Sequence, residues 1–218
     1  KYDNFTVWVV DNGSRPSLEP LLEEKYGEAI RAGQLRILRY ETNTGYAGGY
    51  QRFFEAHGGE VPYLALLNSD VEVTPDWLAP LIQRLEAEPG LAAIQPKIRA
   101  YHQREYFEYA GGAGGLLDPW GYPTCRGRQG FSMERDEGQY DDPIPIFWAS
   151  GAAFVVRTAA VREALRGLLF KSYYFMHMEE IDLCWRLQRA GYTIGYEPRS
   201  LVYHVGGASL AQSDPRKA

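Results

Sequence analysis

The chain of 218 residues is 45% hydrophobic and 23% charged, with a formal net charge of −5. This length suits one α/β domain or at most two small ones, and the acidic balance argues against a nucleic-acid partner. No apolar run of about 18 residues occurs, so the sequence predicts no membrane-spanning helix. Cys125 and Cys184 form neither a disulfide framework nor a Cys-x-x-Cys metal motif, and we expect a cytoplasmic protein.

In the first half of the chain, predicted strands and helices alternate with short connections, which is typical of a parallel sheet flanked by helices. Strands are predicted at 6–10, 35–40, 63–68 and 91–96, and helices at 17–31, 46–57 and 74–88. Thr74, followed by a proline, should cap the last of these helices.

The second half is less regular. From 99 to 145, Gly, Tyr, Pro and Arg accumulate without a helical or strand period, which predicts short strands and mobile loops beside a binding groove. Regular patterns then return, with strands predicted at 151–157, 193–197 and 201–204, a short helix from Thr158, and a long helix at 178–190.

Polar clusters follow the first two predicted strands, at the sheet edge where open α/β folds bind ligands. The first is Asp11-Asn12-Gly13-Ser14, which either forms a tight turn or offers a carboxylate to a base or ribose. The second, NTGYAGG at 43–49, runs into a helix, where glycines let backbone amides approach a phosphate or ribose. Close packing of that helix against the sheet would also explain its glycines.

Oxygen ligands gather after the third predicted strand, in the sequence NSDVE at 68–72. These side chains are either solvated, or they include Asp70 as a ligand of Mg²⁺ or Mn²⁺ shared with substrate phosphates. His204 ends the last predicted strand, and a lone histidine is either a structural residue or a metal ligand.

A carboxylate lies on a largely apolar face of the helix predicted at 178–190. Helical spacing puts Glu180 on one stripe with Leu183 and Leu187. Burial raises the pKa of such a carboxyl group, and this is the environment in which a general base is tuned. Asp182 precedes Arg186 by one turn, which predicts an ordinary ion pair.

Six stretches, in their order along the chain, resemble family 2 glycosyltransferases, particularly the rhamnosyltransferase-like bacterial enzymes that build surface polysaccharides. They are VWVVDNGS, ETNTGYAGGYQ, YLALLNSDVEV, PIFWASGAAFVVR, HMEEIDLCWRLQRAGYTIGYEP and VYHVGG, and they cover nearly the whole chain. The resemblance implies the GT-A fold, a Rossmann-like α/β fold with a mostly parallel sheet flanked by helices. It divides a single domain, 1–218, into a nucleotide-sugar-binding half at 1–97 and an acceptor-binding and catalytic half at 98–218.

The resemblance also implies roles for individual residues. Nucleotide-sugar contacts fall on Asp11, Asn12, Ser14, Asn43, Gly45, Ser69 and Asp70, metal ligands on Asp70 and His204, and acceptor contacts on Trp148, Ser150, Gly151 and Glu179. Glu180 matches the catalytic base. Asn68 replaces the first aspartate of the family's Asp-x-Asp motif, and a neutral amide there should weaken metal binding.

The implied reaction is an inverting single displacement. Glu180 takes the proton from an acceptor hydroxyl as that oxygen attacks the anomeric carbon, and Mg²⁺ or Mn²⁺ stabilises the departing diphosphate. The implied donor is a UDP- or dTDP-linked sugar, with rhamnose as the first candidate, and the acceptor is a glycan or lipid-linked.

Family members normally begin with one more strand and continue further at the C-terminus, often with helices that touch the membrane. Because this chain starts at Lys1 without a methionine, we expect it to be cut at both ends. A full-length protein would then associate peripherally with the inner face of the membrane.

Two other functions stay open on the sequence. One is a non-catalytic sugar-nucleotide-binding module, which the neutral Asn68 and the missing first strand would suit. The other is a sugar-nucleotide nucleotidylyltransferase, although the Gly-rich, Lys- or Arg-bearing loop expected after its first strand is missing from the sequence.

Overall fold

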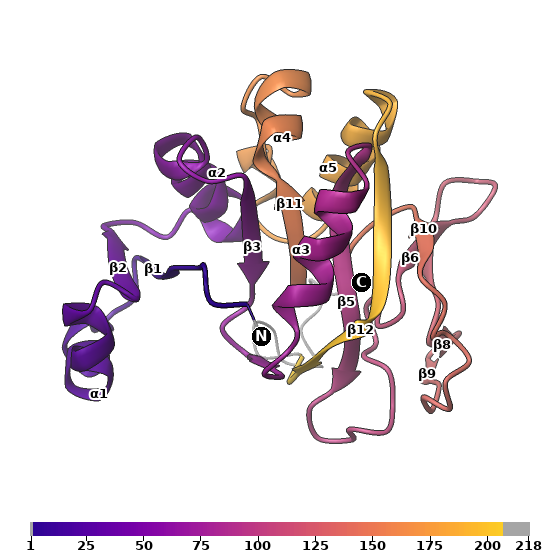
Figure 1. Ribbon diagram of the computed structural model, residues 1–218, viewed down its shortest axis with the longest axis horizontal. Helices are drawn as coiled ribbons and strands as arrows, with labels where there is room; N and C mark the ends of the chain where they lie inside the picture. The colour runs from indigo at the N-terminus through magenta and orange to yellow at the C-terminus, as the bar shows by residue number, and fades with distance from the viewer. Residues whose placement is uncertain (1, 207–218) are drawn as a thin grey trace.

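The computed structural model describes residues 2–206, and its central sheet carries helices on both faces (Figure 1). The helices are α1 (Glu19–Arg31), α2 (Gly45–His57), α3 (Leu78–Ala87), α4 (Thr158–Ala164), the 3₁₀ turn η1 (Ser172–Tyr174) and α5 (Glu179–Arg189). The strands are β1 (Val7–Asn12), β2 (Leu35–Tyr40), β3 (Tyr63–Leu67), β4 (Val71–Val73), β5 (Leu91–Ala100), β6 (Gly115–Leu117), β7 (Pro123–Cys125), β8 (Arg128–Gln129), β9 (Ser132–Met133), β10 (Ile144–Ile146), β11 (Ala153–Arg157) and β12 (Thr193–His204). Among the helices described, none combines the length and the apolar character needed to cross a membrane.

The main sheet has the order β10-β12-β5-β11-β3, and β4 pairs with β12. Only the β5–β12 pairing in it is parallel, because β11 runs antiparallel between β3 and β5, and both β4 and β10 run antiparallel to β12. The predicted α/β class is confirmed, but the predicted predominance of parallel pairing was wrong. β1 and β2 pair in parallel, as a separate two-stranded sheet.

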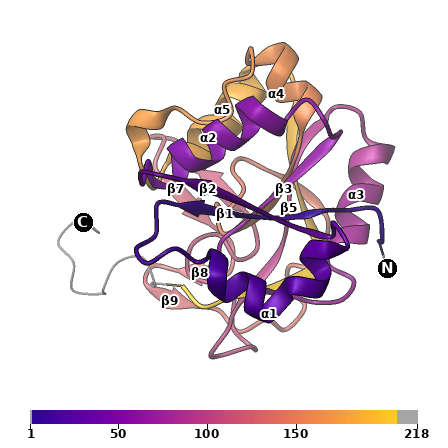
Figure 2. The same ribbon diagram turned by 90° about the vertical axis from the view of Figure 1, so that its left-hand side faces the viewer.

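The alternation of side chains along β11 builds a core on each face of the sheet. Phe154 and Val156 point into the larger core, to which α2, α4 and α5 contribute. Val155 points the other way, into a core shared with Leu81 and Leu85 of α3. Figure 2 shows α2, α4 and α5 grouped on one side of the molecule, away from α3.

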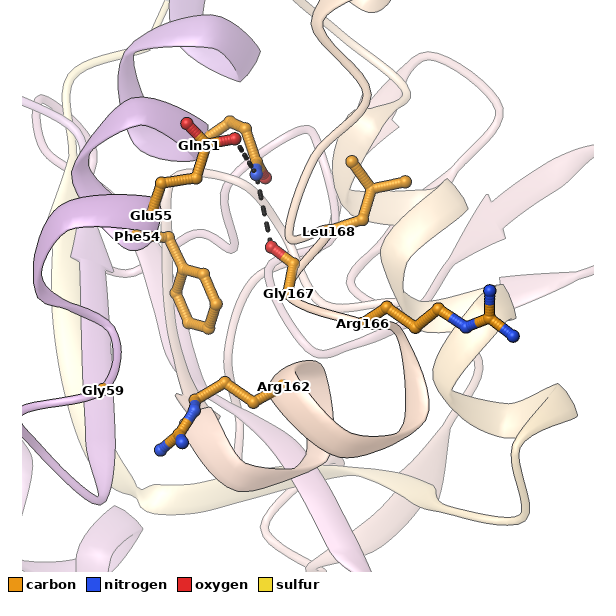
Figure 3. A pocket seen from close by; sticks show the side chains of 8 residues that line it. All are labelled: Gln51, Phe54, Glu55, Gly59, Arg162, Arg166, Gly167 and Leu168. Atoms are coloured by element: carbon orange, nitrogen blue, oxygen red, sulfur yellow. Dashed lines mark hydrogen bonds between the residues drawn. The ribbon is translucent and has the colours of Figure 1, made fainter.

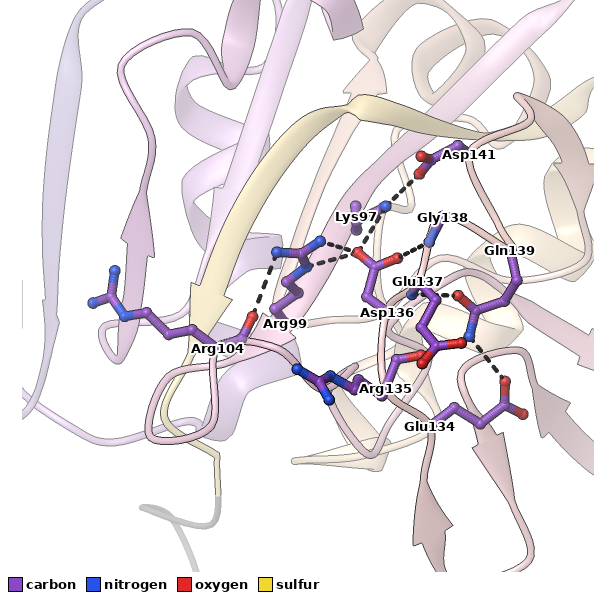
Figure 4. A network of polar contacts seen from close by, with 10 residues as sticks. All are labelled: Lys97, Arg99, Arg104, Glu134, Arg135, Asp136, Glu137, Gly138, Gln139 and Asp141. Atoms are coloured by element: carbon purple, nitrogen blue, oxygen red, sulfur yellow. Dashed lines mark hydrogen bonds and ion pairs between the residues drawn. The ribbon is translucent and has the colours of Figure 1, made fainter.

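The irregular middle of the chain consists of two short hairpins, β6–β7 and β8–β9, as the predicted short strands suggested. The loop that follows is held on β5 by ion pairs, as drawn in Figure 4. Lys97 Nζ lies 2.8 Å from the Asp136 carboxylate and 2.5 Å from that of Asp141, and Arg99 also pairs with Asp136. The side chains of Lys97 and Asp136 are both buried, so these ion pairs connect the loop firmly to the sheet, and its predicted mobility stays a prediction.

Two predicted boundaries were wrong. Helix α3 begins at Leu78 rather than near Thr74, whose hydroxyl donates instead to the carbonyl of Leu201 at 2.8 Å. That bond connects the segment after β4 to β12, and the helix begins only after this segment. The two strands predicted at 193–197 and 201–204 form the single strand β12, with a register shift between Glu197 and Leu201. Residues 207–218 of the predicted second half lie outside the described part.

Candidate active site

The loops after β1 and β2 are joined by side-chain amides. Asn12 Nδ2 donates to the carbonyl of Gly45 at 2.8 Å, and its Oδ1 accepts from the Thr44 backbone N–H at 3.3 Å. The Gly45 N–H in turn donates to Asn43 Oδ1 at 2.8 Å. The structure therefore brings together Asn12, Asn43 and Gly45, which the sequence assigned to one nucleotide-sugar site, at the N-terminus of α2.

Asp11 is almost completely buried and holds its own loop together. Its carboxylate accepts from the backbone N–H of Ser14 at 2.8 Å and pairs with Arg39 of β2. Burial alone would raise the pKa of Asp11, but these hydrogen bonds and the Arg39 charge outweigh it and lower the pKa. The geometry is that of the tight turn, and contact of Asp11 or Ser14 with a nucleotide stays a prediction.

Asp70 and His204, far apart in sequence, lie side by side at the ends of β3 and β12. Asp70 Oδ1 is 3.2 Å from His204 Nε2, and the Val205 N–H donates to the Asp70 carbonyl at 3.0 Å. The opposite ring nitrogen, Nδ1, lies 3.5 Å from a carboxylate oxygen of Glu108. Burial alone would lower the pKa of His204, but the two carboxylates outweigh it and raise the pKa.

A carboxylate and an imidazole are donors that suit Mn²⁺, and water and phosphate oxygens can complete its coordination. Asp70 and His204 fit the predicted metal site in this sense. Within residues 2–206, no group of three or more His, Cys, Asp and Glu side chains is arranged to hold an ion alone. Ser69 lies in the same loop, next to Asp70.

Two adjacent carboxyl groups begin α5. Glu179 and Glu180 each have one buried carboxylate oxygen without a hydrogen-bond partner in the structure. Burial is the main cause that raises the pKa of Glu179 to about 7 and that of Glu180 to about 8, and repulsion by Glu179 adds to the latter. The helix N-terminus favours ionised carboxylates, but here burial prevails.

The rest of α5 follows the predicted stripe. Leu183 and Leu187 are buried, and Arg186 Nε lies 2.6 Å from the Asp182 carboxylate, so the predicted ion pair is confirmed. The chain enters the helix under backbone strain, because His177 and Met178 have φ values of 73° and 72°. Side-chain-bearing residues rarely adopt this conformation, and such residues cluster at functional sites.

The loop before β11 lies against this carboxyl pair. A Cβ atom on Gly151 would be 3.7 Å from the Glu180 carboxyl carbon and 3.6 Å from the Tyr46 hydroxyl. Tyr46 donates to the Gly151 carbonyl at 2.6 Å. Gly151 thus borders the predicted base, and its contact with an acceptor stays a prediction.

Trp148 and Ser150 have different positions from those expected of acceptor contacts. Trp148 is only 6% exposed, and its indole N–H donates to the Leu116 carbonyl at 2.9 Å. Ser150 is 4% exposed, and its N–H donates to Gln95 Oε1 at 2.7 Å. Both side chains support the loop from within, and their contact with an acceptor stays a prediction.

The same loop reaches the predicted metal site. The Asn68 N–H donates to the Ala152 carbonyl at 2.9 Å, which connects the segment of Asp70 to the Gly151 loop. Contacts thus run without interruption from Asn12 through the α2 N-terminus and the Gly151 loop to Glu180 on one side and to Asp70 and His204 on the other. All four polar clusters recognised in the sequence belong to this path.

The family model described as Glycosyl transferase family 2 matches residues 1–163 of the chain. The chain belongs to glycosyl transferase family 2. Its relatives include a protein of Sinorhizobium fredii, y4gI, which is 30% identical over 98% of this chain but only 22% of its own length. The N-acetylglucosaminyl-diphospho-decaprenol L-rhamnosyltransferase of Mycobacterium tuberculosis is 27% identical over 91% of this chain and 66% of its own length. The chain thus spans less than two thirds of these curated relatives.

Solved structures confirm the GT-A fold of this family 2 member. The crystal structure of GalNAc-T7 with UDP, GalNAc and Mn²⁺ matches with a TM-score of 0.65 at 15% sequence identity, covering 91% of this chain and 37% of that one. At such low identity the match speaks for the fold alone.

Three residues that contact the candidate site were missed by the sequence interpretation: Arg39, Tyr46 and Glu108. Arg39 lies on a strand where a basic residue is unremarkable, and Tyr46 occurs within the recognised NTGYAGG stretch, where only the glycines drew attention. Glu108 lies in the irregular region at 99–145, where no period indicates which side chains point inward. Charge type alone could have marked Glu108 as a candidate, but nothing local connected it to His204.

One hollow of the described surface is lined by residues other than those of the candidate site. It has a volume of about 440 Å³ and lies between α2 and the end of α4 (Figure 3). Gln51, Phe54, Glu55, Gly59, Arg162, Arg166, Gly167 and Leu168 line it. Gln51 donates across it to the Gly167 carbonyl at 3.2 Å, whereas Arg162 and Arg166 point in different directions. It contains none of the predicted site residues.

Proposed function

We propose that the chain transfers a sugar from a nucleoside-diphosphate donor to a hydroxyl group of a glycan or lipid-linked acceptor, with inversion at the anomeric carbon. The observation that carries this proposal is the continuous path of contacts from the α2 N-terminus to Glu180 and to the Asp70–His204 pair. Membership of glycosyl transferase family 2 supports it. A binding module would have no use for an unpartnered carboxylate beside that path.

Glu180 is the proposed general base. Its buried oxygen has no partner of its own, so it is free to accept the proton of an acceptor hydroxyl that enters beside Gly151. Glu179, with a second unpartnered oxygen, and the backbone of Gly151 would orient that hydroxyl. Glu179 also disfavours ionisation of Glu180, which makes the ionised base a stronger proton acceptor.

Asn12, Asn43 and Gly45 would position the donor at the N-terminus of α2, with Asp11 and Ser14 holding their loop from beneath. Asp70 and His204 would hold Mg²⁺ or Mn²⁺, with Ser69 beside them. A divalent cation there supplies electrostatic stabilisation of the departing diphosphate.

The finer assignments rest on relatives. A relative named as an N-acetylglucosaminyl-diphospho-decaprenol L-rhamnosyltransferase supports rhamnose as the sugar and a lipid-linked acceptor. A role in surface polysaccharide synthesis is part of the proposal. Thymidine and uridine diphosphates are the nucleotides to test first.

Calorimetric titration with UDP, dTDP and GDP, each with and without Mn²⁺, tests the donor site. One nucleotide should bind more tightly with Mn²⁺, and D70A and H204A should lose that gain. Glu180→Gln should lower kcat by about 10²- to 10⁴-fold and leave nucleotide affinity within a few-fold, because the amide keeps its shape but accepts no proton.

An exposed substitution, Glu163→Gln on α4, serves as the matched control and should leave both measurements unchanged. Unchanged turnover in E180Q would remove Glu180 from the role of base. Nucleotide binding without turnover towards any acceptor would favour a non-catalytic module instead.

A further inference from the structure

Glu108 has a position that the mechanism proposed above leaves unused. It is only 8% exposed, and one carboxylate oxygen, Oε2, accepts from the backbone N–H of Ala110 at 2.7 Å. The other oxygen, Oε1, lies 3.5 Å from His204 Nδ1, slightly beyond the usual hydrogen-bond range. The Nδ1 atom is buried and has no hydrogen-bond partner in the structure.

The imidazole of His204 therefore lies between two carboxylates, with Asp70 at Nε2 and Glu108 at Nδ1. The lone pairs of the two ring nitrogens point away from each other, so one cation cannot bind both. A histidine that binds a metal through one nitrogen commonly donates the N–H of the other to a carboxylate, which fixes the tautomer and the orientation of the ring.

We propose that Glu108 is a positioning residue for the metal site: it accepts a hydrogen bond from His204 Nδ1–H and so directs the Nε2 lone pair towards a divalent cation shared with Asp70. This inference rests on the proposed function, because it assumes that Asp70 and His204 bind the cation.

The reverse arrangement, with the cation between Nδ1 and Glu108, fits the contacts less well. The Glu108 side chain is 10% exposed and that of Asp70 is 20% exposed, so a hydrated cation with its phosphate ligands has better access to Asp70. One Glu108 oxygen is already bound by Ala110 N–H, which suits a fixed hydrogen-bond acceptor.

The test is the affinity for Mn²⁺, measured by electron paramagnetic resonance of free Mn²⁺ in the presence of saturating nucleotide. Glu108→Leu removes the acceptor and should weaken Mn²⁺ binding about 10- to 100-fold. Glu108→Gln should weaken it less, because its amide oxygen can still accept from Nδ1–H. Asp70→Ala, which removes a proposed ligand, should be the most severe.

Glu72→Gln is the control for loss of a nearby negative charge. Glu72 is two residues from Asp70 but is exposed, pairs with Arg104 at 2.9 Å and lies opposite Tyr203 in the strand pairing. Its Mn²⁺ affinity should stay within a few-fold of wild type. Metal-free nucleotide affinity should be unchanged in both Glu108 variants, which a merely structural role would not predict. E108L also leaves the Ala110 N–H without its acceptor and should lower the unfolding temperature slightly, whereas E108Q keeps an acceptor there.

Mn²⁺ affinity in E108L within a few-fold of wild type would overturn the inference, as would an equal loss of metal-free nucleotide affinity. A greater loss in E108L than in D70A would also overturn it, because Glu108 would then be a ligand. If the wild-type chain binds nucleotide but never Mn²⁺, the metal-dependent function itself fails, and the inference with it.

Discussion

Raising the pH from 7 to 9 should increase kcat/KM for sugar transfer, because most of the proposed base, Glu180, is protonated at neutral pH. With the pKa of Glu180 raised to about 8 by burial, only about a tenth of it is ionised at pH 7. A base acts in its ionised form, so kcat/KM should rise about ten-fold over this range and then level off. An unperturbed glutamate would already be ionised well below pH 7 and would give a flat profile.

Glu179→Gln separates the two causes of this shift. The substitution removes the repulsion between the two carboxylates, so the rising limb of the plot of kcat/KM against pH should move to lower pH. It should still lie above the ordinary glutamate value of 4.5, because burial is the larger cause and remains. Glu163→Gln, exposed on α4, should leave the limb in place.

The assay is transfer of radiolabelled sugar at low substrate concentration with Mg²⁺, so that kcat/KM reports on the free enzyme. A wild-type limb below about pH 6 would refute the burial argument for Glu180. A limb that E179Q leaves in place would show that Glu179 does not act on it.

Two glycine substitutions test the path of contacts. Gly45→Ala should destabilise the chain and weaken nucleotide binding, because φ is +73° and the new Cβ would lie 2.3 Å from the Phe175 carbonyl oxygen. Thermal unfolding measures the loss of stability. The control is Gly33→Ala, where φ is +71° but the space is open, and it should cost only about 1 kcal/mol of stability. Gly151→Ala should keep its unfolding temperature and nucleotide affinity, since its nearest contact is an ordinary 3.6 Å, yet raise the KM for the acceptor by filling the space beside Glu180. An acceptor KM equal to wild type would exclude acceptor binding at that point.

Local pattern was sufficient for most of the helices and strands. The stripe on α5 and the short apolar run of β2 are periodic signals carried by neighbouring residues, and both elements occur where they were predicted. Strand pairing depends on residues far apart in sequence, and nothing in AFVVR indicates that β11 runs antiparallel between β3 and β5. Thr74 failed as a helix cap for a similar reason, because its partner, Leu201, is distant along the chain.

In the candidate site, too, single residues could be recognised from the sequence, whereas the contacts between them could not. Glu180 could be recognised from its apolar stripe, and Asp70 and His204 from a family resemblance, but the contact between the last two is a property of the sheet. Trp148 was assigned to the acceptor side from the same resemblance, and the sequence alone did not indicate that its ring is buried. In this fold, Gly115 leaves room for its ring, since a Cβ on that glycine would lie 2.0 Å from it.

The charges along the path explain why a cation would be needed there. Asp70 and Glu108 both present carboxylates to His204, and a nucleoside diphosphate would bring further negative charge to the same edge of the sheet. Arg39 of β2, which reaches the β1 loop, is already paired with Asp11. Like charges in a partly buried site repel strongly, so a divalent cation between Asp70 and the diphosphate would convert that repulsion into attraction. Nucleotide affinity should therefore depend on the divalent cation more than on any single side chain of the donor loops.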